Sequence, residues 1–176
     1  MRKDWTIFFD LDQTLVLTSA LDSLRKARAW AHVYEQFHLT SLPPGTLEFL
    51  LQVRPLAQLG IVTTTPRPYA EKLVVYHHLA LPVVVAYHDT RLHKPHPEPL
   101  LAAMSRLGCS PNRCCYIGDR SDDLRAALNA GIIPIGLSWD GSLDQSWTTT
   151  LLRPICTNWS DVLNTLQQLP KVAGGK

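Results

Sequence analysis

Short apolar runs alternate with longer amphipathic segments along most of the chain. The apolar runs are rich in β-branched and aromatic side chains and are bounded by turn residues, as buried strands of a parallel sheet are. The segments between them carry apolar side chains at spacings of three and four, which is typical of amphipathic helices. Strands are expected at 6–9, 58–64, 81–87, 113–118 and 132–137. This alternation predicts an α/β fold, a Rossmann-like doubly wound parallel sheet of about five core strands.

The expected helices have recognisable start and stop signals. Thr65 is expected to cap one helix, with Pro66 in its first turn. Gly108 and Gly131 follow two others, at the position where helices commonly end. The helices expected from the apolar spacing are 18–37, 46–56, 66–78, 99–107, one that ends at 130, and 161–169. A short edge strand is expected at 154–157.

Composition places the chain among ordinary globular proteins. Its 176 residues suggest about one domain, and 45% of them are hydrophobic. A net charge of +2 with scattered Lys and Arg argues against nucleic-acid binding. The chain shows no signal-peptide pattern and no apolar stretch of membrane-spanning length, so no membrane association is expected. The four cysteines form no Cys-x-x-Cys pair and are interpreted as reduced core residues of a cytoplasmic protein.

Polar side chains gather where the expected strands end. Asp10 and Asp12 directly follow the first strand, where two carboxylates repel each other unless they are solvated, paired or bound to a cation. Thr63 and Thr64 close the second strand, and Asp119 follows the fourth. Because parallel strands present their carboxyl ends at one edge of the sheet, these side chains are expected to converge there.

A polar loop after the third strand carries a cation and several histidines. Lys94, within Lys-Pro-x-Pro, could offset the negative charge of a site that holds several carboxylates. The alternative for such a lysine is an ordinary surface position. His88, His93 and His96 invite a metal interpretation, but their irregular spacing around prolines favours a solvated loop.

Four stretches, in this order, resemble the motifs of the haloacid dehalogenase-like superfamily, in its phosphatase branch, with phosphoglycolate phosphatase-like members. The first is Asp10-Leu11-Asp12-Gln13-Thr14, in which Gln13 stands where the family commonly has Gly. The second is Thr63 at the end of its strand. The third is the Lys94-Pro95-x-Pro97 stretch, and the fourth is the Gly-Asp-x-x-x-Asp pattern of residues 118–123.

The resemblance implies a Mg²⁺-dependent phosphatase that works through an aspartyl-phosphate intermediate. Asp10 would be the nucleophile, and Asp12 would act first as acid and then as base. Thr63 and Lys94 would hold the transferring phosphoryl group, assisted by backbone N–H groups. The backbone groups implied in phosphate binding are those around Leu11, Asp12 and Thr64.

The resemblance also implies a metal site built from oxygen ligands, which Mg²⁺ prefers. Gly118 would let the backbone approach the metal closely. Asp123 would support the waters of the metal or orient Lys94, whereas Asp122 is interpreted as stabilising a helix N-terminus. The implied metal ligands are Asp10, Asp12 through its backbone carbonyl, Asp119 and, for the water shell, Asp123.

The family pattern divides the chain into a core of residues 1–16 and 57–170, an insert of 17–56 and a tail of 171–176. In the family, a cap domain occupies the place of the insert. The insert is short, so it predicts a small helical cap or one that leaves the site open. Alternatively, both of its helices are simply layers on the sheet. Trp139 is expected to pack against the sheet rather than flank the site.

Several functions remain open at this point. A phosphotransferase or phosphomutase of the same superfamily would need a cap that excludes water, and a non-catalytic phosphate-binding module would need only the pocket. The pattern of Asp12, Thr63 and Asp119 disfavours a dehalogenase. The expected substrate is a small phosphorylated metabolite or, given the small cap, a larger phosphorylated partner. A homo-oligomer is compatible with the sequence.

Overall fold

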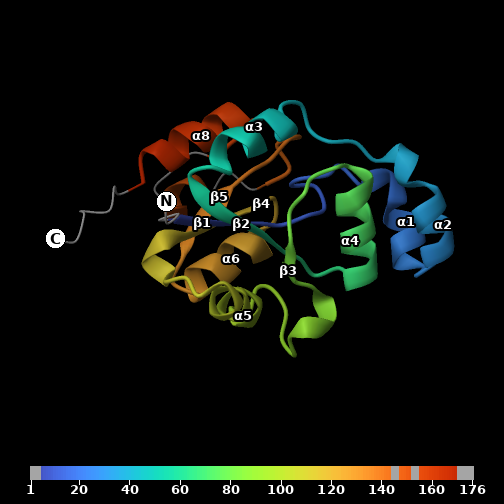
Figure 1. Ribbon diagram of the computed structural model, residues 1–176, viewed down its shortest axis with the longest axis horizontal. Helices are drawn as coiled ribbons and strands as arrows, with labels where there is room; N and C mark the ends of the chain where they lie inside the picture. The colour runs from blue at the N-terminus through green and yellow to red at the C-terminus, as the bar shows by residue number, and fades with distance from the viewer. Residues whose placement is uncertain (1–4, 144–146, 152–154, 170–176) are drawn as a thin grey trace.

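The central element is a parallel sheet of five strands in the order β3-β2-β1-β4-β5 (Figure 1). The computed structural model describes residues 5–143, 147–151 and 155–169. The strands are β1 (Trp5–Phe9), β2 (Ala57–Val62), β3 (Val83–Val85), β4 (Cys114–Gly118) and β5 (Ile133–Gly136). The predicted α/β fold with its doubly wound parallel sheet is confirmed.

Helices cover both faces of the sheet because successive strand residues point to opposite sides. Ile7 and Phe9 belong to the core on one face, whereas Phe8 belongs to the core on the other. The first core is covered by α3 (Thr46–Val53), α4 (Arg67–Tyr76) and α8 (Trp159–Gln167). The second is covered by α5 (Glu98–Leu107) and α6 (Ser121–Asn129), on the side of the sheet away from α3 and α8 in Figure 1. A short helix, α7 (Trp147–Leu151), lies near β5.

The single helix expected over 18–37 is wrong. The chain there forms the 3-10 turn η1 (Ser19–Leu21), α1 (Asp22–Lys26), α2 (Trp30–Glu35) and the 3-10 turn η2 (Phe37–Leu39). The break occurs because Arg28 adopts a left-handed backbone, with φ of +54°. The N–H of Ala29 then bonds to the carbonyl of Leu24, and the N–H of Arg28 bonds to that of Arg25. This is the Schellman arrangement that ends helices, here without a glycine.

The other helix ends follow the same rule with different residues. Gly108 and Gly131 end their helices with left-handed φ values of +64° and +70°, as the sequence predicts. His78, with φ of +53°, ends α4 in the same way. The expectation that Thr65 caps α4 is wrong. Pro66 occupies the cap position and no side chain bonds there, because the hydroxyl of Thr65 lies against another threonine.

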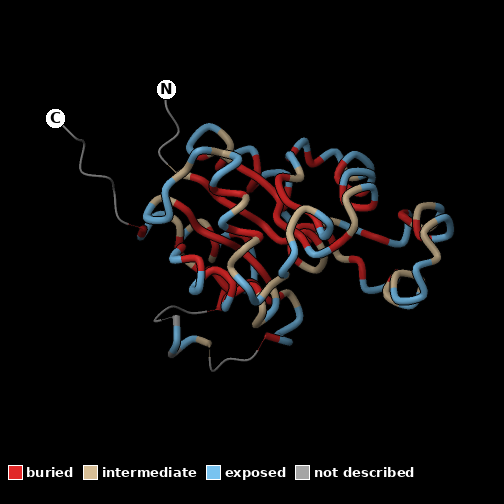
Figure 2. The backbone as a smooth tube through the Cα atoms, turned by 90° about the horizontal axis from the view of Figure 1, so that it is seen from below, coloured by how far each residue is buried: buried red, intermediate tan, exposed pale blue. Residues whose placement is uncertain are grey.

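The segment 17–56 has two structurally different parts. Helix α3 packs on one face of the sheet, where the Phe49 ring stacks on Trp159 at 4.3 Å and meets Phe9 edge-on at 6.1 Å. Helices α1 and α2 stand at one end of the molecule beside α4 (Figures 1 and 2). Helix α3 is therefore arranged as a helix layer on the sheet, whereas α1 and α2 are arranged as a small cap. The domain boundaries expected from the sequence stay a prediction.

Three of the four cysteines, Cys114, Cys115 and Cys156, are buried. Cys156 makes only an isolated parallel bridge with Leu137, while Pro154 of the expected edge strand and the tail 171–176 lie outside the described residues. Trp139 packs edge-on against Trp159 at 5.2 Å. Among the described residues, no helix combines the length and hydrophobicity that crossing a bilayer requires.

Gly60 generates a stability prediction because β2 passes very close to β3 there. A Cβ atom at Gly60 would lie 2.5 Å from Cγ2 of Val84, so one of the two must move. Gly60→Ala is expected to lower the free energy of unfolding by about 1–3 kcal/mol, measured by urea denaturation. Val84→Ala in the Gly60→Ala background should recover part of this loss. Equal stability of Gly60→Ala and the unchanged protein would contradict the close approach.

Candidate active site

The candidate site lies where the strand order of the sheet reverses. Asp10 follows β1 and Asp119 follows the neighbouring β4, and the N–H of Asp10 bonds to the carbonyl of Ile117 at 2.9 Å. Thr63 follows β2, on the other side of β1. This edge is the switch point at which open α/β sheets bind ligands. The sheet therefore brings the polar strand ends together, as expected from the sequence.

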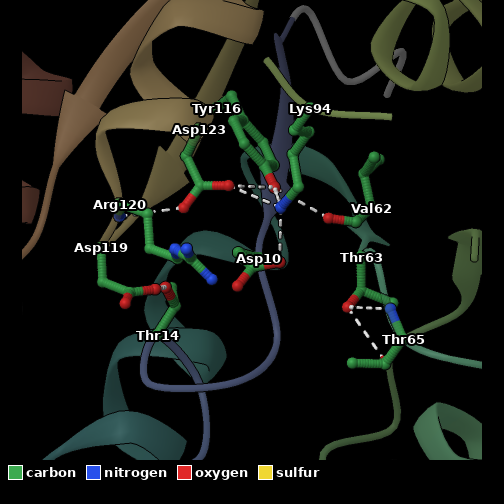
Figure 3. Close-up of polar contacts among 10 residues, drawn as sticks. All are labelled: Asp10, Thr14, Val62, Thr63, Thr65, Lys94, Tyr116, Asp119, Arg120 and Asp123. Atoms are coloured by element: carbon green, nitrogen blue, oxygen red, sulfur yellow. Dashed lines mark hydrogen bonds and ion pairs between the residues drawn. The ribbon is translucent and has the colours of Figure 1, made fainter. Parts of the chain in front are cut away.

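Three carboxyl groups and one ammonium group form the centre of the site (Figure 3). Oxygens of Asp10, Asp119 and Asp123 lie within 4.8 Å of one another. Nζ of Lys94 lies 2.8 Å from Oδ1 of Asp10 and 2.5 Å from Oδ1 of Asp123. The side chains of Lys94 and Asp123 are only 5% and 1% exposed, so water screens these charges little.

The cluster carries more negative than positive charge, and the pKa values reflect this. Burial raises the pKa of Asp10 to about 8, and the charges of Asp123 and Asp119 add to the effect although Lys94 opposes it. Burial and Asp123 likewise raise the pKa of Asp119 to about 6. Burial would lower the pKa of Lys94, but the charges of Asp10 and Asp123 outweigh it and raise the value. The site thus stabilises the charged form of Lys94. It also keeps protons on Asp10 and Asp119 that a bound cation could replace.

Tyr116 holds Lys94 through its hydroxyl group. Its hydroxyl accepts a hydrogen bond from Nζ of Lys94 at 2.7 Å and donates one to the carbonyl of Val62 at 2.8 Å. It also lies 3.3 Å from Oδ1 of Asp123. Nζ has three hydrogens, and in this structure they meet Asp10, Asp123 and Tyr116. An anion that binds Lys94 must therefore share or replace one of these partners.

Ion pairs and a hydrogen bond of Asp89 fix the start of the loop that carries Lys94. Oδ2 of Asp89 accepts from the N–H of Ala86 and from Nη1 of Arg106, both at 2.9 Å. Arg67 of α4 also pairs with Asp89 and donates to the carbonyl of Val83. These contacts join β3, α4 and α5, so the loop begins from a fixed position.

The same loop is tied down a second time just before α5. The carboxylate of Glu98 accepts from the N–H groups of Arg91 and Leu92, at 3.0 and 3.1 Å. His93 stacks on Tyr87 at 4.0 Å. Among the described residues, the metal-compatible groups of His, Cys, Asp and Glu include no histidine. The interpretation of the histidine-rich stretch as a solvated loop rather than a metal site stays a prediction.

Asp12 is separate from the carboxyl cluster. Its Oδ1 accepts from Oγ1 of Thr18 at 2.8 Å and from the hydroxyl of Tyr69 at 2.7 Å, and it pairs with Nη1 of Arg25 at 3.0 Å. Its Oδ2 is buried and has no hydrogen-bond partner among the described residues. An ionised oxygen in that position is costly unless a ligand group completes its environment.

A cavity of about 550 Å³ joins the parts of the site. Thr63 and Thr65 are buried, with their hydroxyl oxygens 3.1 Å apart, whereas Thr64 is exposed. The sequence-derived candidates that line this cavity are Asp10, Asp12, Thr63, Thr64, Lys94, Asp119 and Asp123. Leu11 does not line it, because its side chain is fully buried in the core. A role for Leu11 through its backbone stays a prediction.

Two motif positions have structural reasons that the sequence did not supply. Gln13 adopts φ of +60°, a left-handed backbone that glycine reaches more easily, which explains why Gly suits this position. At Gly118, a Cβ atom would lie 2.5 Å from Cβ of Asp123. The close approach at Gly118 is therefore to Asp123, a side chain of α6. Oδ2 of Asp123 in turn accepts from the N–H of Arg120, so this carboxylate caps α6 as well as binding Lys94.

Several residues of the site were not predicted from the sequence. Thr14 donates to Oδ1 of Asp119 at 2.8 Å, a contact that no sequence pattern predicted. Tyr116 lies inside an apolar strand and looks like an ordinary core residue. Its one sequence signal is strand alternation, which places it on the same face of the sheet as the buried Cys114. Arg25 and Tyr69 approach Asp12 from two different helices, and no local spacing relates them to it.

Comparison with known proteins defines the family. A family model described as haloacid dehalogenase-like hydrolase matches residues 20–137, about two thirds of the chain. The chain belongs to the haloacid dehalogenase-like hydrolases. The matched range contains Thr63, Lys94, Asp119 and Asp123, and it begins after Asp10 and Asp12.

Individual relatives agree with this assignment. The chain is 34% identical over 110 residues to a phosphoglycolate phosphatase of Salmonella paratyphi A, an alignment that covers 61% of this chain and 44% of the relative. The chain thus spans less than half the length of the curated relatives it matches. A haloacid dehalogenase-like family protein from Streptococcus pneumoniae has the same fold, with a TM-score of 0.75 at 19% identity over 95% of this chain and 100% of that one. CbbY from Rhodobacter sphaeroides, solved in complex with phosphate, gives a TM-score of 0.64 at 21% identity over 76% and 85%.

The position of Tyr116 generates a prediction about stability. Tyr116→Phe leaves the buried carbonyl of Val62 without its donor and Lys94 with one acceptor fewer. It should lower the free energy of unfolding by about 1–3 kcal/mol. Tyr76→Phe is the matched control, because Tyr76 is 46% exposed and should tolerate the change. Equal effects of the two variants in urea denaturation would contradict the role of the Tyr116 hydroxyl.

Proposed function

We propose that this protein is a Mg²⁺-dependent phosphatase that hydrolyses a phosphate monoester through an aspartyl-phosphate intermediate. The observation that carries the proposal is the arrangement of Asp10, Lys94, Asp119 and Asp123 at the switch point, with Asp12 held apart in the same cavity. The family assignment and the phosphoglycolate phosphatase relatives support the same reaction class.

The donor set fits a hard divalent cation. Asp10, Asp119 and Asp123 offer only oxygen ligands, which Mg²⁺ prefers, and their excess negative charge needs compensation. Asp10 and Asp119 would hold the ion with the backbone carbonyl of Asp12, while Asp123 supports its water shell. When bound, Mg²⁺ supplies the positive charge that lets an anionic phosphate approach a carboxylate.

The residues of the chain divide the chemistry among them. A carboxylate oxygen of Asp10 forms a bond to phosphorus as the bond from phosphorus to the leaving oxygen breaks. Asp12 gives its proton to that leaving oxygen. It then takes a proton from the water that attacks phosphorus and releases Asp10. Thr63 and Lys94 bind the oxygens of the transferring group throughout.

The substrate is proposed at the level of chemical class. A cavity of about 550 Å³ suits a small phosphorylated metabolite, and a larger phosphorylated substrate would have to enter past α1 and α2. A cytoplasmic location, the absence of nucleic-acid and membrane partners and the oligomeric state stay predictions from the sequence.

Hydrolysis of p-nitrophenyl phosphate tests the proposed reaction. Release of p-nitrophenol should require Mg²⁺ and should be abolished in Asp10→Asn. That variant should stay folded, because burial already raises the pKa of Asp10 to about 8 and Asn resembles the protonated acid in shape. Asp140→Asn is the matched control, since Asp140 lies in an exposed loop outside the cavity lining. Full activity of Asp10→Asn would contradict the nucleophile assignment.

The raised pKa values predict how metal binding depends on pH. Near pH 6 the folded protein without metal holds the proton of Asp10, whose pKa is about 8, and part of the proton of Asp119, whose pKa is about 6. Mg²⁺ must displace these protons, so its affinity should rise by about tenfold or more between pH 6 and pH 8. Calorimetric titration in two buffers of different ionisation enthalpy measures the affinity and the proton release together. A constant affinity without proton release would contradict the prediction.

A further inference from the structure

The two oxygens of the Asp12 carboxylate have very different surroundings. Oδ1 receives two hydroxyl donors, Thr18 and Tyr69, and an ion pair from Arg25, all within 3.0 Å. Oδ2 is buried and receives no hydrogen bond from the described residues. A carboxylate rotates easily about its last bond. The two oxygens can therefore keep these different surroundings only if neighbouring groups hold Oδ1 in place.

Tyr69 is one rigid part of this support. Its side chain is fully buried on α4, and its ring lies 5.8 Å from Trp30 and 5.9 Å from Phe37. The hydroxyl therefore reaches Asp12 from a packed aromatic group and has little freedom to move. Trp30 belongs to α2 and Phe37 to η2, so the segment between β1 and β2 supports Tyr69 from one side.

Arg25 is the second part, and it comes from α1 itself. Its guanidinium group lies over the Tyr69 ring at 5.1 Å while Nη1 contacts Asp12. Nη1 also donates to Oγ1 of Thr18 at 3.1 Å and lies 3.4 Å from Oδ1 of Asp22. Its side chain is only 19% exposed, which keeps the charge partly shielded from water.

We propose that Arg25 and Tyr69 are positioning residues that hold Oδ1 of Asp12 and so fix the orientation of the carboxylate that exchanges a proton with the leaving group and with water. This inference rests on the proposed phosphatase function. It assigns to the helices between β1 and β2 a task beyond covering the cavity, because α1 supplies the cation that orients the acid–base residue. Arg25 and Tyr69 touch Asp12, and through it they act on the reaction.

Two substrates with different leaving groups can separate an effect of these residues on proton transfer from an effect on folding or binding. A leaving group that departs as a stable anion needs little help from Asp12, whereas a more basic leaving group needs its proton. p-Nitrophenyl phosphate and phenyl phosphate have almost the same shape and differ in this respect. A misplaced Asp12 should therefore slow hydrolysis of phenyl phosphate much more.

The experiment compares kcat/KM for the two esters in Arg25→Gln and Tyr69→Phe. We expect Arg25→Gln to lower kcat/KM by about 100-fold for phenyl phosphate and by less than about 10-fold for p-nitrophenyl phosphate. Tyr69→Phe keeps the buried ring and removes only the hydroxyl, so it tests the same point if Arg25→Gln folds poorly. The two substitutions should be non-additive when combined, because they hold the same oxygen.

Matched controls are Arg54→Gln and Tyr34→Phe. Arg54 donates to the carbonyl of Leu79, and Nζ of Lys72 lies 5.2 Å from the centre of the Tyr34 ring. Neither residue lines the cavity, so both esters should be hydrolysed as in the unchanged protein.

The possible results distinguish the inference from the proposed function. Equal losses for the two esters in Arg25→Gln and Tyr69→Phe would overturn the positioning role and leave the phosphatase assignment intact. Failure of the unchanged protein to hydrolyse either ester in the presence of Mg²⁺ would overturn the proposed function, and this inference with it. A selective loss for phenyl phosphate in either variant supports the inference.

Discussion

Three carboxyl groups, of which those of Asp10 and Asp123 are buried, surround one ammonium group, and the rest of the site depends on this interaction. Such a cluster is unstable in isolation, because each carboxylate loses water and only part of the charge is balanced. The sheet forces Asp10 and Asp119 together at adjacent strand ends, and α6 adds Asp123. Lys94 is held in place by Tyr116 on one side and by its clamped loop on the other. Because negative charge remains, the stability of the fold, the protonation of the site and its affinity for a cation depend on one another.

The second part of the chemistry depends on a different set of contacts. Asp12 comes two residues after Asp10, yet its carboxylate points toward α1 and α4 rather than toward the cluster. The proposed nucleophile, Asp10, is therefore positioned by the sheet, and the proposed acid–base residue, Asp12, is positioned by helices. This separation explains how two carboxylates so close in sequence can have different roles.

The fold and the positions of the motif residues could be predicted from the sequence because they follow from local patterns and from strand order. The short apolar runs identified the five strands of the sheet, and the parallel arrangement then placed Asp10, Thr63 and Asp119 at one edge. The break between α1 and α2 could not be predicted, since Arg28 adopts a backbone that usually signals glycine. Tyr116 looked like another core side chain, and its role depends on a lysine that reaches it from a distant loop.

The break at Arg28 has a consequence for how this chain can change during evolution. Helix α1 ends with its own backbone cap before α2 begins, so Arg25 keeps its support on the near side of the bend. Residues inserted between Ala27 and Trp30 would enlarge the roof of the cavity without lengthening the helix that carries Arg25. An insertion there would therefore change the size of the molecule that the cavity admits while the contact between Arg25 and Asp12 is kept.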